Sequence, residues 1–196
     1  MKGITGIAIL VVLVIFLALM GGCSYNSMVT KQEAVEGAWA QVENVYQTRA
    51  DLIPNLVSTV KGAANFEKST LEAVVQARAS ATQVKLDPKN LSESEFARFE
   101  KAQGGVSSAL SRLLVTVEAY PDLKSNKNFL ELQSQLEGTE RRISTERKRF
   151  NEVVQDYNGF IRGFPRNLFA GMFGFTPKAY FKAAAGSDIT PKVDFE

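Results

Sequence analysis

Apolar residues recur along the chain at alternating steps of four and three, the spacing that places side chains on one face of an α-helix. The first such run has the following inward positions: Val35, Trp39, Val42, Tyr46, Arg49, Ile53, Leu56 and Val60. Further runs cover residues 71–81, 99–120 and 129–160, and no window alternates as a β-strand does. The pattern predicts an all-α fold, an antiparallel four-helix bundle of long helices joined by short connections.

The ends of the first two helices follow from local signals. Thr30, with Glu33 three residues later, has the form of a capping box and predicts a first helix from there to about Gly62. The second helix is expected from Leu71 to about Lys85. Residues 62–66 either turn the chain or continue as a bend into the second helix, and periodicity leaves both possibilities open.

The third and fourth helices have clearer limits. Ser92 or Ser94 is expected to begin the third helix, which ends before Pro121 because the residue preceding a proline avoids the α region. The fourth helix begins after Ser125 and gives the longest regular run in the chain.

Pro54 falls one residue outside the inward face of the first helix, so its ring should lie on the solvent side. A proline inside a helix costs about 3 kcal/mol if nothing compensates. One explanation is structural, a kink or a restart of the helix. The alternative is functional, because a kink would free backbone carbonyls near Ala50 as a docking point for another protein.

Charged residues occupy some of the inward positions. Arg49 and Arg78 lie there on the first two helices, and Glu146 on the fourth. Buried charges need partners, so we expect them to pair with one another or with Asp51 or Glu118. They could instead lie at bundle ends and reach water, fix the register of the helices, or form a catalytic carboxylate or ligand site.

The N-terminal segment from Gly3 to Gly22 is uncharged and apolar, and as a helix of roughly 20 residues it would match the thickness of a bilayer's hydrocarbon core. Lys2 precedes it, which favours an N-terminus in the cytoplasm and the rest of the chain outside. The residues before Cys23, LMGG, resemble a bacterial lipobox. Residues 1–23 are therefore expected to anchor the protein to a membrane, either through a lipid on Cys23 or as a retained transmembrane helix.

The mature chain divides into a helical bundle domain, residues 24–163, and a tail, residues 164–196, that is rich in aromatic residues, glycine and proline. The aromatic residues proposed as contacts are Phe169, Phe173, Phe175 and Phe181. The tail either folds back to close one end of the bundle, or contacts the membrane surface or a partner's groove. Its last residues, about ten, are expected to be disordered.

Composition narrows the chemistry further. The net charge is only +2 and acidic residues interrupt the basic ones, which argues against nucleic-acid binding. The chain has no histidine and one cysteine, Cys23, so zinc sites, disulfides within the chain and histidine-based catalysis are excluded. We predict no catalytic residue, metal or cofactor. Helical seams pack equally well within and between chains, so the oligomeric state is not predicted.

Several stretches together resemble the LemA family: RADLIPNLVSTVKG from residue 49, LEAV from residue 71, EAYPDLK from residue 118 and RFNEVVQDYNGFIRGFPRN from residue 149. Tyr25-Asn26 and Trp39 extend the resemblance, which covers the chain from Tyr25 to Phe181. It implies a helical bundle on an N-terminal membrane anchor in a bacterial envelope. It also implies that the protein is frequently found together with membrane zinc proteases and TPM-domain proteins, and that it has no established catalytic activity.

These observations predict a membrane-anchored, extracytoplasmic protein that acts as a scaffold or adaptor through an unidentified envelope protein partner. One alternative is an accessory or regulatory subunit of a membrane protease. The other is a carboxylate-based enzyme that uses Glu118 or Glu146 with a borrowed metal, although no paired acids accompany a nucleophile.

Overall fold

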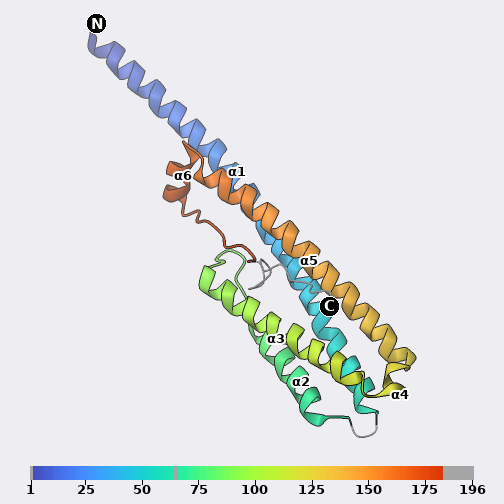
Figure 1. Ribbon diagram of the computed structural model, residues 1–196. Coiled ribbons are helices and arrows are strands. Elements are labelled where there is room, and N and C mark those ends of the chain that lie inside the picture. The colour runs from blue at the N-terminus through green and yellow to red at the C-terminus, as the bar shows by residue number, and fades with distance from the viewer. Residues whose placement is uncertain (1, 64–65, 183–196) are drawn as a thin grey trace, which may run out of the picture.

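The computed structural model describes residues 2–63 and 66–182, without the side chains of residues 2–6, 8, 13 and 16–18. Over this part of the chain every regular element is a helix, as predicted. The helices are α1 (Lys2–Lys61), α2 (Lys68–Gln83), α3 (Glu93–Val117), α4 (Pro121–Lys124), α5 (Lys127–Arg162) and α6 (Arg166–Phe173) (Figure 1).

The helical bundle is built from two pairs of helices. α1 and α5 lie side by side, while α2 and α3 form a shorter hairpin over the half of that pair that is remote from the N-terminus (Figure 1). Two ion pairs show that α1 and α5 are antiparallel: Lys31 with Asp156 at 2.5 Å, and Arg49 with Glu140 at 2.6 Å. The N-terminal turns of α1 project beyond the rest of the molecule (Figure 1).

The predicted start of the first helix at Thr30 is wrong. α1 begins at Lys2, and the Thr30 hydroxyl donates to the carbonyl oxygen of Asn26 at 3.0 Å, one turn back, instead of capping a helix. The reason is that the apolar N-terminal run is itself helical and no proline separates it from the bundle. A threonine inside a helix satisfies its hydroxyl in this way.

The other helix limits lie close to the predictions. α1 ends at Lys61 and α2 begins at Lys68, so the chain turns here and does not continue as one bent helix. Ser92 caps α3: its hydroxyl accepts from the backbone N–H of Glu95 at 3.4 Å and donates to the Glu95 carboxylate at 2.7 Å. Asn126 caps α5 with its side-chain oxygen.

The tail contains a helix that the sequence analysis missed. α6 has eight residues and contains a glycine, so it is too short to show a helical period. Gly174 follows it with φ of 77°, a left-handed conformation that glycine adopts without steric cost. Residues 175–182 then run back along the bundle without regular structure. The predicted disorder concerns residues outside the described ranges.

The core forms two hydrophobic clusters along the bundle. The aromatic cluster surrounds Trp39 and also contains aliphatic residues such as Ile143. The ring centroid of Trp39 lies 5.2 Å from that of Phe99, 5.6 Å from Phe150, 5.8 Å from Phe96 and 6.2 Å from Phe181. The aliphatic cluster comprises Ile53, Leu56, Val60, Leu71, Val74, Ala81, Val106, Leu110, Leu113, Val117, Leu123, Phe129 and Leu136. All eight inward positions predicted from residue 35 to residue 60 are buried.

The apolar N-terminal turns of α1 lack such packing. Their described large side chains are 48–70% exposed: Ile7, Ile9, Leu10, Val11, Val12, Val14, Ile15 and Leu19. Taken over the described residues, none of the helices offers a stretch long and apolar enough to cross a membrane.

Replacing Phe150 with alanine should lower the free energy of unfolding by about 3–5 kcal/mol, because the ring is fully buried among Trp39, Phe96 and Phe181. Urea unfolding of the full chain in mild detergent measures the change. Leu130→Ala, on the same helix but 48% exposed, is the matched control and should change stability by less than about 0.5 kcal/mol. Equal losses in the two variants would contradict the assignment of Phe150 to the core.

Candidate functional site

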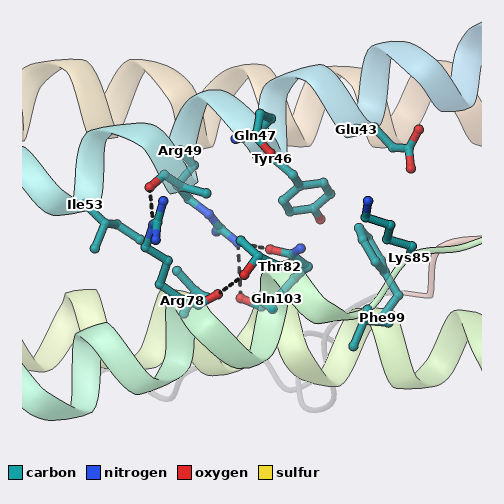
Figure 2. Close-up of a pocket in the computed structure, with 14 residues that line it drawn as sticks. Glu43, Tyr46, Gln47, Arg49, Ile53, Arg78, Thr82, Lys85, Phe99 and Gln103 are labelled. Atoms are coloured by element: carbon teal, nitrogen blue, oxygen red, sulfur yellow. Dashed lines mark hydrogen bonds between the residues drawn. The ribbon is translucent and has the colours of Figure 1, made fainter.

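A buried arginine joins three helices in the middle of the bundle. Arg49 on α1 is 2% exposed. Its Nη1 donates to Ser107 Oγ at 2.8 Å and to Glu140 Oε1 at 2.6 Å, while its Nη2 donates to Gln103 Oε1 at 2.7 Å and to the Gln103 carbonyl oxygen at 3.2 Å. We call these four residues the Arg49 cluster. Figure 2 shows Arg49 extending from α1 to Gln103 on α3.

The Arg49 cluster separates the aromatic cluster from the aliphatic cluster. On each of the three helices, residues of the Arg49 cluster lie between a residue of the aromatic cluster and a residue of the aliphatic cluster. These flanking pairs are Tyr46 and Ile53 on α1, Phe99 and Val106 on α3, and Ile143 and Leu136 on α5. A slip of α1 by one turn would place the guanidinium against apolar side chains, without its acceptors. A register-fixing role for this polar layer stays a hypothesis, since a slipped register would leave the buried cation without its acceptors.

The ion-pair partner of Arg49 differs from the predicted ones. Asp51 is exposed, and Glu118 pairs with Lys124 at the surface. The partner is Glu140, whose side chain is 42% exposed at the edge of the bundle. Sequence reasoning missed it because Thr139 holds the inward position there and Glu140 reaches in from the flank. Gln103, a polar residue at an inward position, was the available signal.

Pro54 and Arg78 are connected through the backbone of α1. Pro54 is exposed, as predicted, and it has no N–H to donate to the carbonyl of Ala50 four residues earlier. The half-buried Arg78 on α2 donates from Nε to that carbonyl oxygen at 2.7 Å (Figure 2). The carbonyl that proline frees is therefore occupied from within the chain.

A cavity of about 230 Å³ lies between α1, α2 and α3, beside the Arg49 cluster (Figure 2). Its polar lining includes Glu43, Arg49, Arg78, Thr82 and Lys85. The Thr82 hydroxyl donates to backbone carbonyls of its own helix, and no cysteine or serine lines the space. The cavity thus combines cations that attract small anions with the carboxylate of Glu43.

Glu146 lies apart from these groups. It is half-buried on α5, and its Oε2 is buried without a hydrogen-bond partner in the described part of the chain, as is Nε1 of Trp39. No three cysteine or acidic side chains gather as metal ligands among the described residues. Of the predicted polar residues, the structure brings together Arg49 and Arg78 and leaves Glu146 elsewhere.

Two asparagines of α5 hold the backbone of the tail. Asn158 Oδ1 accepts from the N–H of Lys178 at 2.8 Å and its Nδ2 donates to the Lys178 carbonyl oxygen at 2.9 Å. Asn151 makes the same pair of bonds to Phe181, both at 2.9 Å. We call these two residues the asparagine clamps. They were not predicted, because a polar residue on a helix gives no sign of a distant backbone partner.

The spacing of the asparagine clamps matches the extended tail. Two helical turns separate Asn151 from Asn158, a rise of about 10.5 Å. Three residues of extended chain, from Lys178 to Phe181, also span about 10 Å. The tail therefore runs antiparallel to α5 with both clamps in register.

Side-chain contacts complete the tail's attachment. The fully buried Tyr157 donates its hydroxyl to the carbonyl oxygen of Thr176 at 3.1 Å, and burial raises the pKa of Tyr157 to about 12. The Lys178 ammonium donates to the Lys89 carbonyl in the loop before α3, and burial lowers the pKa of Lys178. The Arg147 guanidinium lies 4.5 Å from the ring centroid of Phe181.

The aromatic residues proposed as contacts all lie against the bundle to some degree. Phe181 is 6% exposed within the aromatic cluster. Phe169 packs over Gly21, whose added Cβ would come within 3.4 Å of its ring. Phe173 and Phe175 meet the Tyr25 ring edge-on, with centroids 5.1 and 5.8 Å away.

Cys23, the predicted lipid site, is exposed on α1. The helix continues through it without a break, and the Ser27 hydroxyl donates to its carbonyl oxygen at 3.0 Å. Lipidation of Cys23 stays a prediction.

Arg49→Leu should lower the free energy of unfolding by about 1–3 kcal/mol, since it leaves the half-buried polar groups of Gln103 and Ser107 without their donor. The double variant Arg49→Leu/Gln103→Leu should recover part of the loss, because both partners become apolar. Arg112→Leu, an exposed arginine on α3, is the control. Unchanged urea unfolding of Arg49→Leu would remove the register hypothesis.

Stability should fall as pH rises from about 10 to 12. Unfolded tyrosine loses its proton near pH 10, whereas folded Tyr157 keeps its proton to about pH 12, so the unfolded state is favoured in that interval. Tyr157→Phe should flatten the pH dependence of the urea midpoint. It should not abolish it, because burial also raises the pKa of Tyr46. Parallel pH profiles for the two proteins would contradict the burial of the Tyr157 hydroxyl.

Comparison with known proteins gives concordant matches. The model of the LemA family matches residues 38–195. Magnetosome protein MamQ 2 of Paramagnetospirillum magneticum is 27% identical, with 86% of this chain and 70% of the relative covered. MamQ of Magnetospirillum gryphiswaldense is 26% identical over the same shares, and Protein LemA of Metamycoplasma hominis is 23% identical over 81% of this chain and 69% of the relative. Because the family model spans most of the sequence, the chain belongs to the LemA family.

Proposed function

We propose that this protein is a non-enzymatic scaffold or adaptor of the cell envelope, anchored to a membrane through residues 1–23 and held on the extracytoplasmic side. The observation that carries the proposal is the continuity of α1, which begins in the exposed apolar N-terminal run and ends in the core of the bundle. An anchor and a bundle that share one helix cannot turn freely against each other.

The proposed bundle works as a rigid body. α1 has 60 residues, and at 1.5 Å per residue it extends about 90 Å. Its second half packs with α2, α3 and α5 as an antiparallel four-helix bundle whose register the Arg49 cluster sets. Such a rod would hold a binding surface at a fixed height above the membrane, which is what a scaffold requires.

The chemistry of the Arg49 cluster supports a role without catalysis. Arg49 is the most deeply buried charged side chain of the described residues, and its guanidinium donates hydrogen bonds to Ser107, Gln103 and Glu140. The cavity beside it is lined by no cysteine or serine.

The anchor is tested by fractionation of cells that express the full chain. The protein should remain in the membrane pellet after alkaline carbonate, and a variant that lacks residues 3–22 should appear in the soluble fraction. Release of the full chain by carbonate would refute anchoring. Fatty-acid labelling of the wild type and of Cys23→Ala separates the two anchors, since only a lipidated Cys23 takes up label.

The adaptor role is tested by crosslinking in intact envelopes followed by mass spectrometry. Cross-links should join exposed positions of the bundle, such as Val75 and Val115, to a second envelope protein. A membrane protease among the cross-linked proteins would assign the accessory-subunit function instead. Cross-links confined to this chain would contradict an adaptor.

A further inference from the structure

One face of α6 exposes large apolar side chains to solvent. Leu168 and Met172, one turn apart on α6, are 60% and 75% exposed, and Phe164, just before the helix, is 83% exposed. We call these three residues the α6 apolar face. Side chains of this size grouped on one helix usually mark a contact site.

The opposite face of α6 packs against the bundle. The exposure of the α6 apolar face is therefore not caused by a detached segment. Ala170 is 3% exposed within the core, Phe169 covers Gly21, and Phe173 meets Tyr25 edge-on. Contacts with both α1 and α5 hold the helix in place. The α6 apolar face is therefore directed outward by the packing of the other side.

The position of α6 along α1 indicates what covers this face. The exposed apolar run of α1 ends at Leu19, which is 65% exposed, and α6 packs on Gly21 and Tyr25. Two residues of helix rise only about 3 Å, so α6 lies at the level where the apolar run stops. Figure 1 shows α6 beside α1 at the point where α1 leaves the bundle.

Two arginines, Arg162 and Arg166, lie close to the α6 apolar face along the chain. Arg162 is exposed in the last turn of α5, and the Arg166 guanidinium on α6 lies 4.2 Å from the ring centroid of Phe160. Apolar side chains with arginines nearby along the chain suit the boundary between acyl chains and anionic headgroups.

We propose that the α6 apolar face inserts into the surface of the membrane that holds the N-terminal anchor. The helix then forms a second attachment beside α1 and fixes the tilt of the bundle. The occupant is a lipid surface and not a protein, because α6 packs on α1 at the level where the exposed apolar run of α1 ends. This inference rests on the proposed anchoring.

The test places a fluorophore on α6 in the full chain. Leu168→Trp is reconstituted into vesicles of phosphatidylcholine and phosphatidylglycerol, with or without brominated acyl chains. Bromine should quench its fluorescence at least about twofold more than that of Val115→Trp, a 74% exposed position on α3. The native Trp39 is fully buried and contributes equally to both variants.

The possible outcomes separate the two proposals. If both variants float with the vesicles but are quenched equally, the α6 inference is wrong and the anchor stands. If neither variant floats, anchoring itself fails, and the α6 inference fails with it. Adding Phe164→Ser and Met172→Ser to Leu168→Trp should reduce the quenching while flotation is kept, and unchanged quenching would also overturn the inference.

Discussion

The hydrogen bonds of the Arg49 guanidinium join three helices at one level of the bundle. Apolar seams alone tolerate a slip of one heptad, because one aliphatic side chain replaces another at little cost. A buried cation does not, since its acceptors on α3 and α5 lie at one level only. The aromatic and aliphatic clusters meet at this level of the bundle.

α2 is attached to α1 at Ala50, the residue next to Arg49, through a backbone defect. Pro54 leaves the Ala50 carbonyl without its usual donor, and Arg78 supplies one from α2. The hydrogen bond that α1 lacks at Ala50 is replaced by one between α1 and α2. An alanine in place of Pro54 would restore the helical hydrogen bond and compete with Arg78 for the same oxygen, so the proline reserves that acceptor for α2.

Periodicity predicted the buried positions of α1 and the solvent-facing side of Pro54, because both depend on the geometry of a single helix. It could not predict Glu140 as the partner of Arg49 or the asparagine clamps, since these bonds join segments far apart in the chain. The start of α1 was misplaced because a capping sequence acts only where a helix begins. α6 was missed because eight residues are too few to establish a period.

The place of Phe181 also constrains the order in which the protein can fold. The ring of Trp39, near the start of the bundle, is enclosed partly by Phe181, near the end of the described chain. A ribosome adds residues in sequence, so the aromatic cluster cannot close before Phe181 has been made. Closure of this core therefore follows the synthesis of every helix from α1 to α6.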